Sequence, residues 1–260
     1  MPSYTDQTGR EIKLAGIPTK IVSTVPSQTE LLHYFGLEEE VIAITKFCIH
    51  PSIWFAEKLK VGGTKNLNLD LIRSLSPDLI ISNKEENTRE QIEELCQHYP
   101  VWVSDISDLG DACNMIARLG EITGKKEIAE LLVNKIQKNF KSLTIPEETV
   151  RAAYLIWQKP YMVAGGDTFI DSMLQYAGYD NVFKDRLRYP TVSIGEIKNK
   201  KPATILLSSE PFPFKEKHVL DFRDMLPESK VRVVDGEMFS WYGSRLLQTP
   251  GYFELLKIDG

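Results

Sequence analysis

One loop of this chain gathers side chains that suit the binding of a flat, partly anionic ligand. Residues Phe239–Arg245 read FSWYGSR and place Trp241, Tyr242 and Arg245 close together around a glycine. Aromatic rings bury a large area at low entropic cost, and a guanidinium pairs with carboxylate, phosphate or chelate oxygens. Aromatic residues are hard to bury together in a polar loop, so we favour a ligand-binding role over core packing.

Two cysteine–histidine pairs raise the question of a metal site. Cys48 is followed at a spacing of two by His50, and Cys96 likewise by His98. The chain has 3 cysteines and no CxxC motif, which argues against a disulfide framework and against a zinc ribbon. Each pair offers only two ligands, so we expect buried thiols, no metal site and no resident cofactor.

Sequence signatures of catalysis and of nucleic-acid binding are missing. There is no GxSxG motif, no P-loop and no GxGxxG after a strand, and no acid–base pair stands at a recognisable spacing. The net charge is −5 and the basic residues form no cluster, which disfavours binding to phosphate backbones. The sequence therefore predicts a protein that is not an enzyme and does not bind nucleic acid.

The elements that must position these side chains alternate between strand and helix. Short apolar runs bounded by turn residues predict strands; they cover Ile21–Val25, Val41–Thr45, Leu79–Ser82, Val101–Ser104, Ala152–Trp157, Tyr161–Val163, Thr204–Ser208 and Val231–Val234. Helices are predicted over Ser27–Phe35, Leu69–Leu75, Thr88–His98, Asp167–Ala177 and within Ser244–Leu256. Ser27 and Glu30 predict a capping box at the first of these helices. Alternating buried strands and helices indicate an α/β fold with parallel sheets covered by helices.

One sequence motif occurs twice in the chain, once in each half. Asn68–Glu85 reads NLDLIRSLSPDLIISNKE, and Ser193–Glu210 reads SIGEIKNKKPATILLSSE. Both run from a short amphipathic turn through proline into an apolar strand and a polar turn that ends in glutamate. We therefore predict two βα lobes of similar plan, residues 1–106 and 144–260.

A helical segment, residues 107–143, separates the two lobes. Apolar residues at helical spacing predict a first helix that ends at Gly124 and a second helix that runs to Leu143. Nothing in the segment is rich in glycine or serine, so we expect a stiff rod that limits relative motion of the lobes to small rocking.

The first lobe contains extra residues that the second lobe lacks. Gly36 and Pro77 are 41 residues apart, whereas the matching Gly178 and Pro202 are 24 apart. Insertions of this kind form loops, and loops on a rigid scaffold often carry function. Lys65 and Asn66 lie in this insertion and offer donors to an anionic ligand, although solvated loop residues are an equally good interpretation.

Several stretches together resemble a known family. Residues 6–14 (DQTGREIKL), 18–37 (PTKIVSTVPSQTELLHYFGL) and 61–82 (VGGTKNLNLDLIRSLSPDLIIS), with the two-helix centre, are similar to class III substrate-binding proteins of ABC importers. This family binds vitamin B12 or ferric siderophores and is also called the helical-backbone metal receptors. The resemblance implies two Rossmann-like lobes joined by a single long backbone helix, with a ligand cleft between the lobes and no catalysis.

The same resemblance suggests ligand-binding residues. In the members that bind vitamin B12, aromatic side chains from both lobes face the corrin, and Phe47, His50 and Tyr189 stand at matching positions. Trp54 lies in the same insertion, and for both His50 and Trp54 packing on their own lobe is an equally good interpretation. Glu85 and Glu86 follow the end of a strand, where α/β proteins bind ligands, and are further candidates.

The family also docks on its transporter through one carboxylate on each lobe. Asp70 matches the position in the first lobe, seven residues before the proline. The equivalent position in the second lobe is Gly195, and the acid is shifted to Glu196. An acid near a helix start is also favoured by the helix dipole alone, so for Glu196 both interpretations stay open.

Three functions follow in order of preference. The first is a monomeric binding protein for a cobalamin-like corrinoid or a ferric siderophore, which feeds an ABC importer permease. The second is a cytoplasmic carrier or sensor of a corrinoid or tetrapyrrole that kept the fold. The third is a chelatase-type enzyme, which would need His50 with Glu85 or Glu86. The first residues contain no signal peptide and no lipidation cysteine, so as written we expect a cytoplasmic location, or a periplasmic or membrane-associated one if an upstream signal is missing.

Overall fold

The computed structural model describes residues 1–258 and divides the chain into two compact units. Unit 1 comprises residues 1–106, 110–136 and 242–245; unit 2 comprises residues 107–109, 137–241 and the chain from Leu246 onward. Unit 1 thus takes in residues 110–136 of the helical segment and residues 242–245 in addition to the lobe 1–106 that the sequence suggested.

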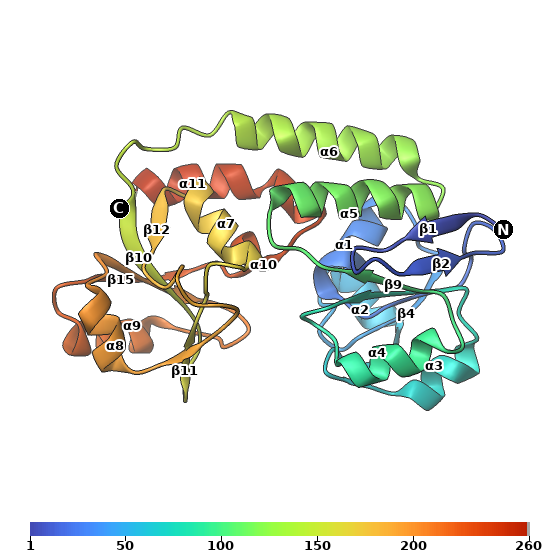
Figure 1. Ribbon diagram of the computed structural model, residues 1–260, viewed down its shortest axis with the longest axis horizontal. Helices are drawn as coiled ribbons and strands as arrows, with labels where there is room; N and C mark the ends of the chain where they lie inside the picture. The colour runs from blue at the N-terminus through green and yellow to red at the C-terminus, as the bar shows by residue number, and fades with distance from the viewer. Residues whose placement is uncertain (259–260) are drawn as a thin grey trace. The chain divides into compact units, whose positions relative to one another are not determined.

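Unit 1 is built on a five-stranded sheet in which every neighbouring pair is parallel, in the order β5-β4-β3-β8-β9. Its elements are β1 (Ser3–Thr5), β2 (Glu11–Lys13), β3 (Ile21–Ser23), α1 (Pro26–Tyr34), β4 (Val41–Ile44), α2 (Ser52–Glu57), β5 (Leu59–Lys60), β6 (Gly62–Gly63), β7 (Asn66–Leu67), α3 (Leu69–Leu75), β8 (Leu79–Asn83), α4 (Arg89–Cys96), β9 (Val101–Ser104) and α5 (Leu109–Ile122). Figure 1 shows α3 and α4 on one side of this sheet and α5 on the other. Strands β3, β8 and β9 are buried at every residue, as expected for a sheet covered on both faces.

Unit 2 contains a six-stranded sheet in the order β13-β11-β10-β14-β15, with β12 paired to β10. Its elements are β10 (Val150–Trp157), β11 (Tyr161–Val163), α7 (Phe169–Tyr176), β12 (Tyr179–Asn181), β13 (Thr191–Val192), α8 (Ile194–Lys200), β14 (Thr204–Ser208), α9 (Glu216–Met225), β15 (Lys230–Val234), α10 (Glu237–Ser240), a 3-10 turn (Ser244–Leu247) that begins in unit 1, and α11 (Thr249–Ile258). Strand β11 runs antiparallel to β10 and to β13, so the sheet is mixed and the expectation of a purely parallel sheet was wrong here.

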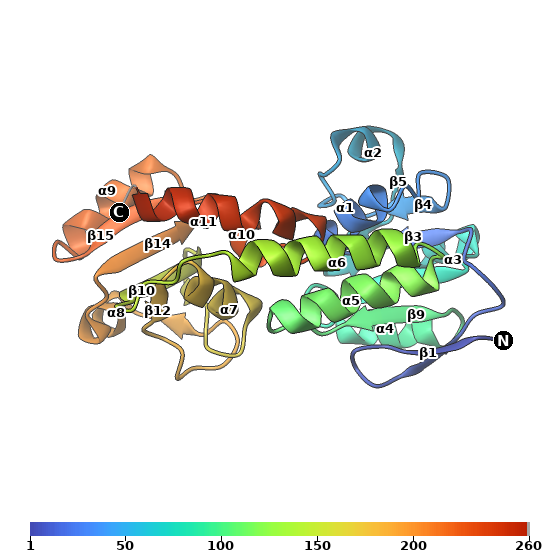
Figure 2. The same ribbon diagram turned by 90° about the horizontal axis from the view of Figure 1, so that it is seen from above.

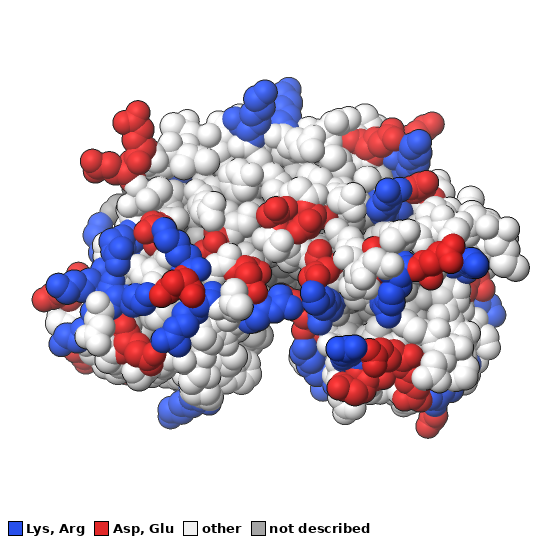
Figure 3. All heavy atoms as spheres, in the orientation of Figure 1, with Lys and Arg blue, Asp and Glu red and all other residues white. Residues whose placement is uncertain are grey.

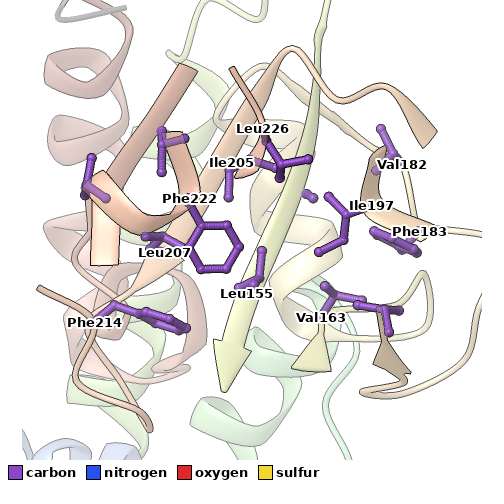
Figure 4. Packing of buried hydrophobic residues seen from close by; sticks show 14 residues of the cluster. Leu155, Val163, Val182, Phe183, Ile197, Ile205, Leu207, Phe214, Phe222 and Leu226 are labelled. Atoms are coloured by element: carbon purple, nitrogen blue, oxygen red, sulfur yellow. The ribbon is translucent and has the colours of Figure 1, made fainter. Parts of the chain in front are cut away.

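The core of unit 2 forms where α8 and α9 pack on this sheet. Figure 4 shows Phe222 of α9 close to Leu155 and Leu207 of the two central strands. Ile197 of α8 belongs to the same fully buried cluster. Burial of such side chains stabilises the fold by about 1.5–3 kcal/mol each. The α/β class predicted from the sequence is therefore confirmed in both units.

The helix α6 (Lys126–Lys141) follows α5 and passes from unit 1 into unit 2 at Ile136 and Gln137. Figures 1 and 2 both show α5 and α6 side by side. At their close approach in unit 1, a Cβ atom on Gly120 would lie 2.2 Å from the Cβ of Ala129. Only glycine fits at position 120, which explains why a residue with poor helix propensity occurs inside α5.

The repeated motif is structurally equivalent in the two units. Helices α3 and α8 each have 7 residues and end at a residue in the left-handed conformation, Ser76 (φ 49°) and Lys201 (φ 47°). Pro77 or Pro202 follows, and strands β8 and β14 start two residues later. Asn68 and Ser193 accept hydrogen bonds as the two N-caps. The sequence comparison therefore predicted this joint correctly.

The start of α1 differs from the prediction. The N-cap is Val25, no side chain caps the helix, and Pro26 occupies the first turn, so the expected capping box at Ser27 was wrong. Proline needs no hydrogen-bond partner at that position and has a φ angle suited to a helix start. The short strands β1, β2, β5, β6, β7, β12 and β13 were not predicted.

The left-handed ends of α3 and α8 give a stability prediction. We expect Lys201→Gly to raise the free energy of unfolding by about 0.5–1 kcal/mol, because glycine adopts a positive φ without steric cost. The same change at Lys198, inside α8 and exposed, is expected to lower it by about 1 kcal/mol. Urea unfolding of the two variants and the parent protein measures both effects. A lower stability of Lys201→Gly would contradict the prediction.

Candidate ligand-binding site

The carboxyl ends of β3, β4, β8 and β9 lie at one edge of the unit 1 sheet, because these strands are parallel. The buried residues at this edge are small and polar rather than charged; they are Ser23, Thr24, Thr45, Ser82, Asn83 and Ser104. Ligands of open α/β sheets bind outside the carboxyl ends of the strands. We refer to this region, with the loops that follow each strand, as the unit 1 edge.

Two asparagines hold the loops of the unit 1 edge together. The Oδ1 atom of Asn87 accepts hydrogen bonds from the backbone N–H of Asn83 (2.9 Å) and from the hydroxyl of Thr24 (3.0 Å). Its Nδ2 donates to the carbonyl of Thr64 at 3.0 Å. The Oδ1 of Asn83 accepts the backbone N–H groups of Glu85 (2.8 Å) and Glu86 (2.9 Å). The turn that follows β8 is therefore fixed to two other loops.

The side chain of Lys65 reaches the turn that carries Glu86. The ammonium of Lys65 donates to the carbonyl of Glu85, and the hydroxyl of Thr88 donates to the carbonyl of Lys65 at 2.8 Å. Glu86 is partly buried. Desolvation raises the pKa of its carboxyl group above the usual range, against the lowering effect of Lys65, and Glu85 raises it further. The site thus disfavours negative charge at Glu86.

Phe47 presents an exposed ring close to β6. Its side chain is 51% exposed, and the Lys46 ammonium lies 5.2 Å from the ring centroid. A Cβ atom on Gly63 would stand 3.1 Å from the Phe47 ring, so a glycine at position 63 lets the ring lie close over β6. Asn66, in β7, is also exposed. The structure therefore brings Phe47 close to the loop that carries Lys65.

Other residues of the insertion are used in packing. Trp54 in α2 is 2% exposed and contacts His33 edge-to-face, with ring centroids 5.2 Å apart. Cys48 is buried; its Sγ lies 3.1 Å from the hydroxyls of Thr29 and Thr45, and desolvation raises the pKa of its thiol. His50 is half-buried. Trp54 is thus part of the core of unit 1.

No metal centre is found among residues 1–258. Three or more His, Cys, Asp and Glu side chains do not come together anywhere in that range in a way that suits a metal ion. Likewise, none of the helices in that range is long and apolar enough to span a membrane.

We refer to residues Phe239–Arg245 as the aromatic loop. In unit 2, a glutamate holds the start of this loop. The Nε1 of Trp241 donates to Oε1 of Glu210 at 2.9 Å, and the hydroxyl of Ser240 donates to the same oxygen. Trp241 is 5% exposed. Tyr189 is half-buried and follows Arg188, which has a positive φ of 59°. The indole of Trp241 is therefore a buried, hydrogen-bonded side chain.

The end of the aromatic loop is anchored to unit 1 by an ion pair. The guanidinium of Arg245 donates to both carboxylate oxygens of Glu30, at 2.6 and 3.1 Å. The Arg245 and Glu30 side chains are only 10% and 18% exposed, and neighbouring Tyr242 is 7% exposed. A bidentate pair of this kind is strong and specific in geometry. An anionic ligand would have to compete with Glu30 for Arg245.

The two acids expected to dock on a transporter differ in their surroundings. The Asp70 side chain is 95% exposed, and its ion pair with Arg73 (2.7 Å) joins neighbouring turns of α3. Glu196 completes a capping box with Ser193 and pairs with Arg186 at 2.9 Å. The hydrogen bonds from Ser193 hold the pKa of Glu196 below its usual range. Glu196 therefore has a structural role that Asp70 lacks.

Sequence reasoning missed Glu210 and Glu30. Glu210 is the counterpart of Glu85 at the end of the repeated motif, so the repeat itself contained the signal. Glu30 lies 215 residues from Arg245, and no local pattern relates the two.

Comparisons with known proteins agree with this fold. The family model described as "Periplasmic binding protein" matches residues 21–228. A vitamin B12-binding protein of Pectobacterium carotovorum is 26% identical over 239 residues, which cover 89% of this chain and 85% of the relative. One of Vibrio parahaemolyticus is 25% identical over 194 residues, or 73% and 70% of the two chains.

Solved structures share the architecture at low sequence identity. The vitamin B12-binding protein BtuF of Vibrio cholerae has a TM-score of 0.76 at 20% identity and covers 93% of this chain and 98% of its own. The catecholate-siderophore-binding protein VctP of the same organism has a TM-score of 0.80 at 13% identity, with 98% and 99% covered. These similarities confirm the two-lobed fold expected from the sequence. The family match covers most of the chain, and this protein therefore belongs to the periplasmic binding proteins, which bind substrates rather than catalyse reactions.

Proposed function

We propose that this protein binds a metal chelate, a corrinoid or a ferric siderophore, and delivers it to an ABC importer. The single observation that carries the proposal is the unit 1 edge, where the exposed ring of Phe47 lies against Gly63 and the adjoining Thr64 is bonded to Asn87 of the turn after β8. A rigid, flat complex gains affinity from an aromatic face, and a preorganised turn supplies hydrogen bonds without an ordering cost.

The other candidate residues form two groups under this proposal: those that would contact the ligand and those that would hold loops in place. His50, Lys65, Asn66, Glu85 and Glu86 belong to the loops of the unit 1 edge and would contact the ligand. In unit 2, Tyr189 is the candidate with a partly exposed side chain. Trp54, Trp241, Tyr242 and Arg245 are buried and would act by holding loops in place, so their removal is expected to affect folding as well as binding.

A receptor for an importer collects its ligand outside the cytoplasmic membrane, so the proposal places the protein in that compartment. Its partner there would be the importer permease. Asp70 is our main candidate for contact with the permease, because it is fully accessible and its exposed pair with Arg73 contributes little to stability. Glu196 is proposed to contribute less, since it would have to leave Arg186 and Ser193.

Titration with chelates tests the proposal directly. We expect purified protein to bind at least one of dicyanocobinamide, cyanocobalamin, haem and a ferric siderophore, with quenching of tryptophan fluorescence and a change in chelate absorbance. Failure of every chelate to bind at tens of micromolar would contradict the proposed function.

Phe47 provides a more specific prediction. We expect Phe47→Ala to weaken chelate binding about tenfold, because the ligand loses an aromatic contact worth about 1.4 kcal/mol. Phe55→Ala is a matched control, since Phe55 is 41% exposed in the same insertion and has Lys60 5.1 Å from its ring. Isothermal titration of both variants measures the difference. Equal effects of the two substitutions would show that Phe47 is an ordinary surface residue.

The docking role of Asp70 is tested separately from ligand binding. We expect Asp70→Asn to lower the ligand-dependent ATPase activity of the reconstituted importer at least fivefold while the chelate affinity stays unchanged. Glu90→Gln serves as the control, because Glu90 is an exposed acid at the same position in the first turn of α4. If Asp70→Asn supports full ATPase stimulation, the carboxylate is only a favourable helix-start residue.

A further inference from the structure

Glu86 is a carboxyl group without a partner at a preorganised position. Within residues 1–258, no group donates a hydrogen bond to its carboxyl oxygens and no cation lies within ion-pair distance. Its backbone N–H is fixed to Asn83, so the turn does not have to rearrange to present the side chain. A partly buried carboxyl group that has no protein partner can hydrogen-bond only to solvent, which a ligand can replace. Such a group suits a ligand that supplies the missing hydrogen bond.

The nearest cation does not fill this role. The Lys65 ammonium donates to the backbone carbonyl of Glu85 rather than to the Glu86 carboxylate. Lys84 is paired with Asp105, and the Lys46 ammonium lies over the Phe47 ring. Each lysine of the unit 1 edge therefore already has a contact, and Glu86 remains available to a ligand.

The charges of the unit 1 edge offer no net attraction to a polyanion. The loops of the unit 1 edge carry three lysines and three acids; these are Lys46, Lys65, Lys84, Glu85, Glu86 and Asp105. Figure 3 shows acidic and basic side chains interspersed on the visible face of both units. A chelate with several carboxylates or catecholates would meet like charge at Glu85 and Glu86.

We propose that Glu86 is a specificity-determining residue that forms a hydrogen bond with a carboxamide on the rim of the chelate, so that the protein selects amide-bearing, corrinoid-type chelates over chelates with peripheral carboxylates. This inference rests on the proposed function and narrows its substrate class.

A carboxamide on the ligand can form hydrogen bonds with Glu86 whether the glutamate is ionised or protonated. An ionised carboxylate accepts from the amide N–H, and a protonated carboxyl group both donates to the amide carbonyl and accepts from its N–H. A carboxylate on the ligand can pair only with the protonated form and repels the ionised one. Binding sites built around such a hydrogen bond discriminate strongly against ligands that cannot form it.

The test compares two corrinoids that differ only in their side chains. Dicyanocobinamide carries neutral amides, and dicyanocobyrinic acid carries carboxylates at the same positions. We expect the parent protein to bind dicyanocobinamide at least tenfold more tightly. Glu86→Ala should lose about tenfold in affinity for dicyanocobinamide but not for the acid. Glu86→Gln, which keeps the shape and a hydrogen-bonding group, should stay within about threefold for the amide probe and bind the acid more tightly.

Controls separate this inference from the proposed function. Glu90→Ala, a change to an exposed acid of α4 away from the turn, should leave both affinities as they are, and circular dichroism verifies that each variant is folded. Suppose that chelates bind but the parent protein does not prefer dicyanocobinamide over dicyanocobyrinic acid, or that the Glu86 variants show the same preference as the parent protein. The role of Glu86 is then refuted while the proposed function stands. If neither corrinoid nor any other chelate binds, both are refuted.

Discussion

The hydrogen bonds of Asn83 and Asn87 are the constraint on which the candidate site depends. Parallel strands place the ends of β3, β8 and β9 at one edge, but backbone pairing stops there. The two side-chain amides continue the connections beyond the strands and tie the loops at Thr24, Thr64 and Glu85 to one another. Because buried amides must be satisfied, these loops have little freedom to separate. Glu86, Lys65 and, through Gly63, Phe47 all take their positions from this arrangement.

The architecture could be predicted from the sequence because its signals are local. Each copy of the repeated motif holds its own N-cap, helix, proline and buried strand within 18 residues, and the structure has all of them in both units. The antiparallel strand β11 could not be predicted in the same way. Its three residues look like any short buried strand, and its direction is set by pairing with β10 rather than by its own side chains.

The site was only partly accessible to sequence reasoning. The candidate acids after β8 follow from a general rule about strand ends, and the structure places them at the sheet edge. The aromatic loop is different, because the buried Trp241 donates a hydrogen bond to Glu210, 31 residues away, and Arg245 pairs with Glu30 at a separation of 215 residues. Composition suggested exposed aromatic residues, whereas long-range partners decided their burial. Membership of the family indicates substrate binding but does not assign a role to each side chain.

Hydrogen–deuterium exchange with and without dicyanocobinamide is the most direct measurement of the central claim that a chelate contacts the unit 1 edge. The proposed function and the geometry predict slower exchange in the ligand complex at residues 46–50, 63–66 and 83–87, with no change in α4 (Arg89–Cys96). Binding of the chelate with unchanged exchange at all three loops would contradict this location of the site.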